Sequence, residues 1–384
     1  MNETQENNEN LSKIYKNRRR KLALQMKNQG VAAILFEDKD GCRDPSVRYY
    51  TGHPNDALFI LFSDETSFLV AWDENLAKKM ANVGKIIPYS RYENSHIRAV
   101  RAIANYAKIE GKQTFELPEV TSYPDFLQYV DALSGWDVRC RKQSLHNFAE
   151  MQRAVKDEME IASIRQAAKV TDRIIDLIEE KVRSGEIKTE TDVALLIEKE
   201  LRKDGCEKTG FDTLAAGPGR SFAIHCFPNY TNQSWPADGL SILDFGVVCN
   251  GYTSDVTLTI AKGKLTEAQE KQLELVQKAY TECLKLYEKN VPLAEAAKKA
   301  AEIFAAEKRS MPHSLGHGIG LEIHEAPFVR AAASSENLFL PGMVVTLEPG
   351  LYDAETGGTR LENDVLITEK GPEVLTHSRI IRID

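Results

Sequence analysis

Apolar and polar positions alternate in two distinct ways along the first third of the chain. Short continuous apolar runs, which are typical of buried strands, occupy residues 31–36, 57–62 and 66–72. In residues 95–111 and 123–135 the apolar side chains instead recur at the spacing of one helix face. Because strands that alternate with amphipathic helices are typical of a compact α/β fold, this part of the chain is predicted to form one α/β domain.

A longer helical pattern opens the rest of the chain. Residues 149–185 keep helical spacing for several turns and end on Gly185, so we place the start of a second domain near residue 150. Beyond it the pattern predicts helices at residues 190–205, 266–290 and 293–309, and strands at residues 240–248, 252–260, 343–348 and 359–368. The expected organisation is a disordered tail (residues 1–12), an N-terminal α/β domain (residues 13–150) and an α+β domain (residues 151–384).

Length and charge narrow the classes of function. With 384 residues the chain is long enough for two domains that each bury a core. Its 49 basic and 57 acidic residues give a net charge of −8, and its dense basic block is KNRRRK at residues 16–21, so nucleic acid is not expected as a partner. No run approaches the ~18 to 20 apolar residues of a membrane span, and the polar start MNETQENNENLSK does not match a secretory signal.

The cysteines bear on both metal chemistry and location. All six are scattered and no two form a CxxC pair: Cys42, Cys140, Cys206, Cys226, Cys249 and Cys283. A thiolate zinc site is therefore not expected, and any metal would be held by carboxylates and imidazoles. Without a paired spacing that indicates disulfides, the composition favours a reducing cytoplasm.

The dipeptide Asn-Gly at residues 250–251 separates two β-rich runs and is the pair most typical of a tight hairpin turn. If it forms the loop, Cys249 pairs with Tyr252, and counting outward places Asp244 opposite Thr257. The sequence therefore predicts a two-stranded ribbon with this register.

Two aspartates are expected on one face of this ribbon. Asp255 precedes Thr257 by two residues, hence it shares a face with Asp244 and lies diagonal to it, about 7 to 8 Å away between backbones. Apolar neighbours such as Ile242 and Val256 indicate that the ribbon is buried. Either aspartate alone is typical of a solvated hairpin end. A buried pair of like charges, however, is unfavourable unless a cation or a proton neutralises it, so the pair favours a metal ion.

Glu348 and Glu362 interrupt strand-like runs further along the chain. Alone, each would be expected at the surface or beside an arginine, and Arg360 is close enough in sequence to pair with Glu362. Together with Asp244 and Asp255 they make four carboxylates, whose charge two divalent cations would cancel. Sites rich in carboxylate, with little imidazole and no thiolate, favour manganese, with zinc, cobalt and ferrous iron as alternatives.

The stretch HSLGHGIGLEIHE at residues 313–325 holds three histidines and does not by itself decide which of them binds metal. The order Asp, Asp, His, Glu, Glu, in the settings LDFGVVCNGYTSDVT, GHGIGLEIHE, TLEPGLY and TRLENDV, resembles the Xaa-Pro aminopeptidase and prolidase family of dinuclear metallopeptidases. Methionine aminopeptidase and creatinase are relatives of that family. The resemblance runs from about residue 150 to residue 382 and implies a pita-bread fold there. The preceding domain resembles the creatinase-type N-terminal domain in size, α/β alternation and the stretch RYYTGHPNDALFIL.

The resemblance also implies a ligand set for two divalent metal ions. The five ligands would be Asp244, Asp255, His317, Glu348 and Glu362. Asp255 and Glu362 would bridge both ions, and Glu348 would also act as a catalytic proton carrier. The glycines beside His317 would let the backbone approach a crowded site.

Further residues receive roles from the same resemblance. His225 and His324 would bind the substrate and take part in catalysis, and His313 would line the specificity pocket. Arg360 and Asp364 would hold the last glutamate ligand in place.

The activity implied is release of the N-terminal residue from peptides with proline in the second position, with a metal-bridged hydroxide as the attacking group. A prolidase restricted to Xaa-Pro dipeptides shares size and ligands, so it stays an alternative. A hydrolase of small amides or amidines on the same fold is another, and relatives that bind proteins without catalysis have lost ligands that are intact here. The family implies a homodimer in which the N-terminal domain of one subunit closes the partner's site.

Overall fold

The structure is a computed structural model that describes residues 3–106 and 112–384. The chain divides into two compact units, Met1–Gln152 and Arg153–Asp384. The domain boundary predicted from the sequence lies between residues 150 and 151. No helix in the described part of the chain is long and apolar enough to cross a membrane.

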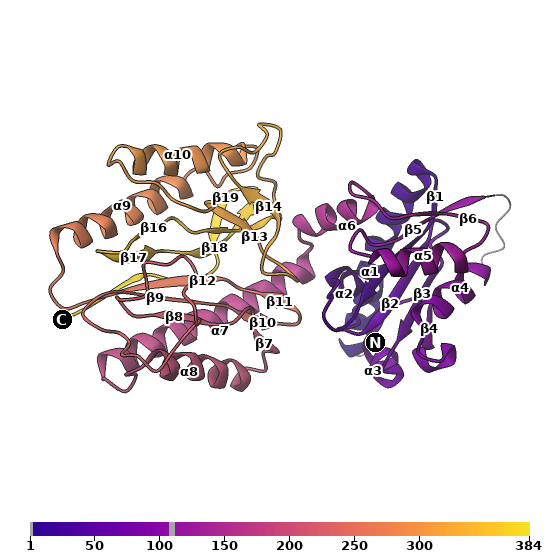
Figure 1. Cartoon of the computed structure of the whole chain (residues 1–384), viewed down its shortest axis with the longest axis horizontal. Helices are drawn as coiled ribbons and strands as arrows, with labels where there is room; N and C mark the ends of the chain where they lie inside the picture. Colours follow the sequence, from indigo (N-terminus) through magenta and orange to yellow (C-terminus); the bar gives the residue numbers. More distant parts are fainter. Residues whose placement is uncertain (1–2, 107–111) are drawn as a thin grey trace. The chain divides into compact units, whose positions relative to one another are not determined.

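The N-terminal unit is built on one mixed sheet with strand order β4-β3-β2-β1-β5-β6 (Figure 1). Its strands are β1 (Val31–Asp38), β2 (Ala57–Phe62), β3 (Ser67–Ala71), β4 (Lys85–Pro88), β5 (Gln113–Glu116) and β6 (Trp136–Arg139). The pairs β1–β2 and β2–β3 are antiparallel, and the other neighbours are parallel. The three apolar runs of the sequence form β1, β2 and β3, as expected.

Helices cover both faces of this sheet. They are α1 (Glu3–Gln29), α2 (Pro45–Thr51), α3 (Glu74–Met80), α4 (His96–Tyr106), α5 (Tyr123–Ala132), α6 (Leu145–Ala154) and the short 3₁₀ helix η1 (Tyr89–Tyr92). Successive residues of β1 point to opposite faces: Leu35 packs in the cluster with α4 and α5, and the ring of Phe36 lies 5.3 Å from that of Tyr50 in α2. The helix predicted over residues 95–111 is confirmed as α4, although residues 107–111 lie outside the described residues.

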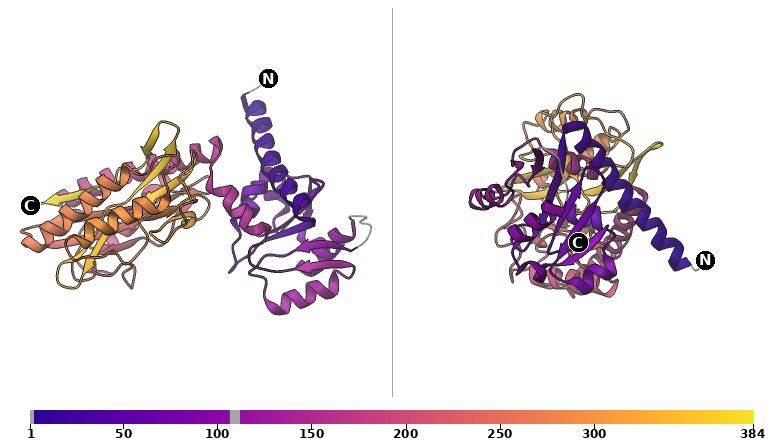
Figure 2. Two further views of the ribbon diagram at one scale, coloured as in Figure 1. Left: turned by 90° about the horizontal axis from the view of Figure 1, so that it is seen from above. Right: turned by 90° about the vertical axis from the view of Figure 1, so that its right-hand side faces the viewer.

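A disordered tail was expected at residues 1–12, but helix α1 begins at Glu3 (Figure 2). Glutamate, glutamine, leucine and lysine are good helix formers, and acidic residues near the start suit the helix dipole. Arg18 and Arg19 of the basic block donate hydrogen bonds to the carbonyl oxygens of Tyr49 and Tyr50 at 2.9 and 2.6 Å. This anchoring supports the helix although its apolar content is low.

The helix predicted over residues 149–185 is broken near its start. α6 ends at Ala154, and α7 (Glu158–Arg183) begins after Asp157. The side chain of Asp157 accepts a hydrogen bond from the backbone N of Glu160, and the Glu160 side chain accepts one from the backbone N of Asp157. Apolar spacing continues across this capping box, so periodicity alone hid the break, which the D-x-x-E pattern marks.

Two larger sheets of the C-terminal unit lie between the helix pairs α7–α8 and α9–α10 (Figure 1). The remaining helices are α8 (Glu190–Lys203), α9 (Glu267–Leu284) and α10 (Leu293–Ala305). The strands of the first sheet, in the order β20-β12-β9-β8, are β8 (Leu214–Ala216), β9 (Gly239–Phe245), β12 (Val256–Lys262) and β20 (Ile380–Ile383). Those of the second, in the order β14-β13-β15-β18-β19, are β13 (Gly316–Gly318), β14 (Glu325–Val329), β15 (Val344–Leu347), β18 (Asn363–Thr368) and β19 (Gly371–Val374).

Two small sheets complete the unit. Their strands are β7 (Lys208–Thr209), β10 (Val247–Cys249) and β11 (Tyr252–Thr253) in one, and β16 (Gly350–Asp353) and β17 (Gly357–Arg360) in the other. Apolar residues of α7 and α8 pack on the first larger sheet, and those of α9 and α10 pack on the second. The inner sides of the two sheets are thereby left to form a site.

The predicted hairpin register is confirmed. Cys249 pairs with Tyr252, and Asp244 lies opposite Thr257. Asn250 and Gly251 have φ values of 53° and 86°, the left-handed backbone that a tight two-residue hairpin turn needs.

Cys206 and Cys249 form a disulfide, with their Cα atoms 4.6 Å apart. No local pattern indicated this pair, because the two cysteines lie 43 positions apart in the sequence. The end of α8 and strand β10 come together only in the folded unit. The expectation of scattered, unpaired cysteines is therefore wrong for these two and holds for the free cysteines Cys42, Cys140, Cys226 and Cys283.

Candidate metal centre and active site

One cavity of the C-terminal unit, about 490 Å³ in volume, brings together most of the predicted site residues. Nine of the ten line it: His225, Asp244, Asp255, His313, His317, His324, Glu348, Arg360 and Glu362. The tenth, Asp364, is fully buried and does not line the cavity.

Three of the carboxylates reach the cavity from places where strands end or break. Asp255 lies between β11 and β12, Glu348 directly follows β15, and Glu362 lies between β17 and β18. The continuous strand predicted over residues 359–368 is therefore wrong. The chain leaves the ladder before Glu362, which forms an isolated bridge with Thr257 of β12 and so links the two larger sheets.

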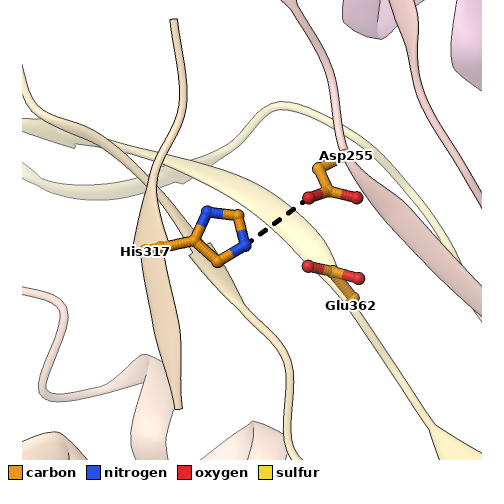
Figure 3. Close-up of side chains that lie close together, drawn as sticks. All are labelled: Asp255, His317 and Glu362. Atoms are coloured by element: carbon orange, nitrogen blue, oxygen red, sulfur yellow. Dashed lines mark ion pairs between the residues drawn. The ribbon is translucent and has the colours of Figure 1, made fainter. Parts of the chain in front are cut away.

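Asp255, His317 and Glu362 form the tightest group in the cavity (Figure 3). One potential ligand atom of each lies within 4.8 Å of the others. Nε2 of His317 is 3.6 Å from Oδ2 of Asp255 and 3.5 Å from Oε1 of Glu348. Oxygen and nitrogen atoms that could bind a metal, from both larger sheets, thus lie close together in one small volume.

Local backbone contacts fix the ring of His317. Its backbone N donates to Oγ1 of Thr346 at 3.1 Å, and its Nδ1 lies 3.2 Å from the carbonyl oxygen of Gly318. Donation from Nδ1 leaves the lone pair of Nε2 directed at the carboxylates. A Cβ atom at Gly316 would overlap the Thr346 carbonyl, and one at Gly318 would overlap that of Ala326. The glycines therefore permit the close backbone approach that the sequence predicted.

Asp244, in β9, is held by Arg360, whose Nη2 donates to Oδ2 at 2.5 Å. Arg360 was expected to hold Glu362; its Nε lies 3.9 Å from that carboxylate, as an ion pair, and donates a hydrogen bond to Oγ1 of Thr257 at 2.7 Å. Its Nη1 donates to the hydroxyl of Tyr352, also at 2.7 Å. The hydrogen bond to Asp244 was not expected; it forms because β17 packs against β9 and brings the guanidinium to Asp244.

Asp364 was expected to hold Glu362, but it contacts a different ligand candidate. Its Oδ2 accepts a hydrogen bond from the backbone N of Asp255 at 3.1 Å, so it positions Asp255 rather than Glu362. Glu362 is held by Thr257, whose Oγ1 donates to Oε2 at 2.7 Å. Asp255 and Asp364 are 109 residues apart, and no local pattern indicates such a contact.

Burial and mutual repulsion change the proton affinities of this group. Burial, and next the charge of Glu362, raise the pKa of Asp255 well above its ordinary value, and the same causes act on Glu348. Burial raises the pKa of Glu362 to about 7. Burial lowers the pKa of His317 to about 3, which favours the neutral imidazole that a metal ligand needs.

The side chains present fit a divalent cation. Oδ1 of Asp244 is buried and has no hydrogen-bond partner among the described residues. Neighbouring carboxylates with raised pKa and a buried oxygen without a partner are both stabilised when a cation binds between them. Oxygen donors with one imidazole suit manganese and similar ions, in keeping with the expectation from the sequence.

The other three histidines line the same cavity in different settings. His313 is fixed by its Nδ1, 2.8 Å from the carbonyl oxygen of Ser314, and by its Nε2, 3.0 Å from the hydroxyl of Tyr352. Burial lowers its pKa to about 4. The ring of His324 lies 4.3 Å from that of His317 in an edge-on arrangement, and His225 is exposed at the cavity wall.

Sequence reasoning missed three side chains of this site. Thr257 contacts both Arg360 and Glu362, and its alternation with Asp255 along the ribbon was the available signal. Tyr352 lies between His313 and Arg360, and no pattern singled it out. Arg330 lines the cavity, and nothing in its sequence setting indicated so.

Comparisons with known proteins agree with the geometry of the site. An uncharacterised peptidase of Staphylococcus haemolyticus is 31% identical over 348 residues, which are 86% of this chain and 92% of that protein. An Xaa-Pro dipeptidase of Pyrococcus horikoshii is 28% identical over 365 residues, 91% and 97% of the two chains. The crystal structure of the X-Pro aminopeptidase from Thermotoga maritima is similar with a TM-score of 0.82 at 25% identity and covers 95% of this chain and 99% of that one.

The expected fold class, a mixed α/β chain of two domains with a pita-bread catalytic part, is confirmed by this likeness. The sequence profile of metallopeptidase family M24 matches residues 162–369, a segment that contains every carboxylate and histidine of the cavity. Since that segment is more than half of the chain, the protein belongs to metallopeptidase family M24 and is a hydrolase.

Proposed function

We propose that the protein is an Xaa-Pro aminopeptidase, which releases the N-terminal residue from peptides with proline in the second position. The observation that carries this proposal is that a single cavity is lined by all three substrate-binding candidates, His225, His313 and His324, together with the acid cluster. The similarity to the X-Pro aminopeptidase of Thermotoga maritima supports it.

The proposed metal ligands for two divalent ions are Asp244, Asp255, His317, Glu348 and Glu362, with Asp255 and Glu362 shared between the ions. Manganese is the proposed metal, and zinc, cobalt and ferrous iron are the alternatives. Such ions would polarise the scissile carbonyl and acidify the attacking water. The convergence of Asp255, His317 and Glu362 within 4.8 Å supports this assignment.

Side chains of the protein would carry out the remaining steps. Glu348 would take a proton from the attacking water and deliver it to the leaving nitrogen, because a proline amide nitrogen has no proton of its own. His324 and His225 would place the substrate and stabilise the charge that develops on its carbonyl oxygen. Arg360 would keep Asp244 in its orientation through the hydrogen bond between them.

Hydrolysis of Ala-Pro-Ala by the purified protein tests the proposal. We expect about two equivalents of divalent metal per chain, loss of turnover with a chelator and recovery with manganese. Asp255→Asn should lower kcat/KM by at least about a thousand-fold, since it removes a shared ligand. Asp131→Asn, an exposed aspartate of α5, is the matched control. A metal-free protein, or cleavage that survives Asp255→Asn, would contradict the assignment.

A prolidase is the second candidate, and the similarity to the Xaa-Pro dipeptidase of Pyrococcus horikoshii favours it. A panel of Ala-Pro, Ala-Pro-Ala and longer peptides separates the two. Cleavage of the dipeptide alone would replace the first proposal by this one. No observation on the described residues favours the amide or amidine hydrolase that the sequence left open.

We further propose that residues 13–150 form the creatinase-type domain, that residues 151–384 form the catalytic domain, and that the protein is a homodimer whose N-terminal domains close the partner's sites. The resemblance of RYYTGHPNDALFIL supports the first part. Sedimentation of the purified protein should give a species of twice the chain mass. A monomer at working concentration would contradict the dimer.

A cytoplasmic location is also a proposal. It implies that Cys206 and Cys249 meet reducing conditions in the cell, although their sulfur atoms are bonded in the structure. Thiol labelling in fresh, denatured lysate should then modify all six cysteines. Labelling that spares these two would place the protein in an oxidising compartment.

A further inference from the structure

A second cavity of the C-terminal unit, about 760 Å³ in volume, adjoins the one just described. His313, Ser314 and Arg330 line both and form their common wall. The far side of the second cavity is formed by α10 and by the segment that follows it, which includes Arg309. Because the same three residues line both cavities, the two cavities lie directly next to each other.

The second cavity has a charge opposite to that of the first. Arg309 and Arg330 line it, and its described lining contains no aspartate or glutamate. The protein as a whole carries a net charge of −8, so a cavity with two arginines and no acid is distinctive in this chain. Its charge is complementary to an anion.

Arg330 is held in one orientation, and no described residue is an acidic partner for it. It follows β14, and its guanidinium carbon lies 4.6 Å from the ring centre of Phe328, which lines the first cavity. Val329 between them is buried, so Phe328 and Arg330 share the outer face of the strand. Among the described residues Arg330 forms no ion pair with a carboxylate. An aromatic ring thus holds the guanidinium in place while its N–H groups remain available.

Arg309 and the surface of α10 complete the cavity. The guanidinium of Arg309 donates one hydrogen bond to the described residues, from Nη2 to Oε1 of Gln272 at 3.0 Å, and forms no ion pair with them. Ala301 and Ala305 of α10 are exposed and line the cavity, so their short side chains leave its volume open.

On the basis of the proposed peptidase function, we propose that the second cavity binds the part of the substrate that follows proline, and that Arg330 and Arg309 select a carboxylate there. The carboxylate is supplied either by the C-terminus of a tripeptide or by an acidic side chain at its third position. Planar guanidinium groups bind both in the same two-pronged way. The preferred substrates are then acidic peptides longer than a dipeptide.

Three peptides test the selection: Ala-Pro-Ala, Ala-Pro-Ala-amide and Ala-Pro-Asp-amide. The amide without an acid is the internal reference, and each of the others supplies one source of carboxylate. We expect kcat/KM about ten-fold higher for at least one of the two acidic peptides, through a lower KM, as one charge-assisted pair provides. Preference for the first assigns the C-terminus, and preference for the third assigns the side chain. Equal rates on all three peptides would overturn the inference.

Arginine variants locate the preference. Arg330→Gln should bring the ratio of kcat/KM for the acidic peptide to kcat/KM for the neutral peptide close to one, by raising KM for the acidic peptide. Arg330→Lys should keep part of this preference because the charge remains. Arg309→Gln should reduce the ratio less, since Gln272 already engages its guanidinium. Lys278→Gln, which removes one exposed positive charge on α9, is the matched control and should keep the ratio. A ratio unchanged in Arg330→Gln would overturn the assignment.

Filling the cavity gives a test that does not depend on charge. Ala301→Leu places a larger side chain on the exposed cavity face of α10 and should raise KM for Ala-Pro-Ala-Ala several-fold. Ala306→Leu, one turn further on and outside the cavity lining, is the control for effects of the extra methyl groups. Equal KM values for the two variants would contradict a peptide path through the cavity.

Binding of the product separates this inference from catalysis. Calorimetric titration of metal-free protein with Pro-Ala, Pro-Asp-amide and Pro-Ala-amide should give tighter binding of at least one of the two acidic products than of Pro-Ala-amide, and Arg330→Gln should remove the difference. Equal binding of all three products by the unsubstituted protein would overturn the inference while leaving the peptidase proposal intact. If the metal-loaded protein cleaves none of the peptides, the proposed function fails, and the inference that rests on it fails too.

Discussion

Ionisation of an acid in the cavity lowers the stability of the folded protein when no metal is bound. Burial raises the pKa of Glu362 from an ordinary value near 4.5 to about 7. A carboxyl group whose pKa is higher in the folded state stabilises the fold below its unfolded value, and this contribution is lost as pH rises through the folded value. The metal-free protein should therefore lose stability between about pH 4.5 and pH 7.

Thermal unfolding in the presence of a chelator measures this effect. The melting temperature of the unsubstituted protein should fall across that pH range more steeply than that of Glu362→Gln, because the amide cannot ionise. Saturation with manganese should reverse the order of the two proteins, since a bound cation favours the ionised carboxylate. Parallel pH curves for the two metal-free proteins would contradict the raised pKa.

Thr257→Val tests the hydroxyl that joins two parts of the site. The change keeps the shape of the side chain but removes the hydrogen bonds to Glu362 and from Arg360, both of 2.7 Å. We expect a loss of about 1 to 3 kcal/mol in unfolding free energy and a ~10- to 100-fold loss in metal affinity. Denaturant unfolding and metal titration are the measurements, with Thr281→Val on the exposed side of α9 as control. Unchanged metal affinity would show that the hydroxyl does not orient Glu362.

The sequence predicted which residues meet in the cavity better than which residue holds which. Asp244 and Asp255 were located by counting outward from one turn, and the motif order identified His317, Glu348 and Glu362. The hydrogen bonds from Arg360 to Asp244 and from Asp255 to Asp364 were not predicted, because they join residues 116 and 109 positions apart and are set by the packing of one strand on another. Local spacing contains no information about such contacts.

At the scale of elements, the hairpin that carries Asp255 depends on a glycine. Gly246 lies between β9 and β10, and a Cβ atom there would overlap the carbonyl oxygen of Ser254, beside Asp255. Gly246→Ala should destabilise the protein by about 1 to 3 kcal/mol and weaken metal binding, because the ribbon must separate to make room. Gly219→Ala is the control, since its Cβ would meet no atom within 4 Å. Chemical denaturation and metal titration decide, and equal effects of the two changes would refute the reason given.

Element boundaries were predictable where a turn or cap has its own chemistry. The Asn-Gly pair fixed the register of the ribbon, whereas the break between α6 and α7 stayed hidden because apolar spacing runs through it. The strand predicted across Glu362 failed for a related reason. Apolar residues lie before and after Glu362 in the sequence, so the apolar pattern does not show that the strand is interrupted there. The backbone leaves the strand at this point because of its pairing with the other sheet.

At the scale of the whole molecule, the two compact units should respond differently to metal. All proposed ligands lie in Arg153–Asp384, so metal binding stabilises this unit directly. Scanning calorimetry should resolve two transitions, of which manganese raises one. At a metal concentration a hundred times the dissociation constant, binding should raise the unfolding free energy of this unit by about 2.7 kcal/mol. A single transition that shifts as one would show that the units unfold together.

The two-unit architecture was accessible from the sequence because the periodicity of the apolar residues changes near residue 150. The topology of the sheets was not. Strand orders such as β14-β13-β15-β18-β19 depend on pairings that no local pattern contains, and only the family resemblance implied the resulting pita-bread fold.

The crowding of acids between the two sheets affects how this fold can change during evolution. Replacing Asp255, Glu348 or Glu362 by an uncharged residue of similar size is expected to remove the proposed activity, yet it also removes a buried acid whose ionisation weakens the metal-free protein. A duplicated copy under relaxed selection therefore gains folding stability as it loses its chemistry. Pseudoenzymes with an intact scaffold are the natural outcome, and their binding surfaces can evolve without compensating substitutions in the core.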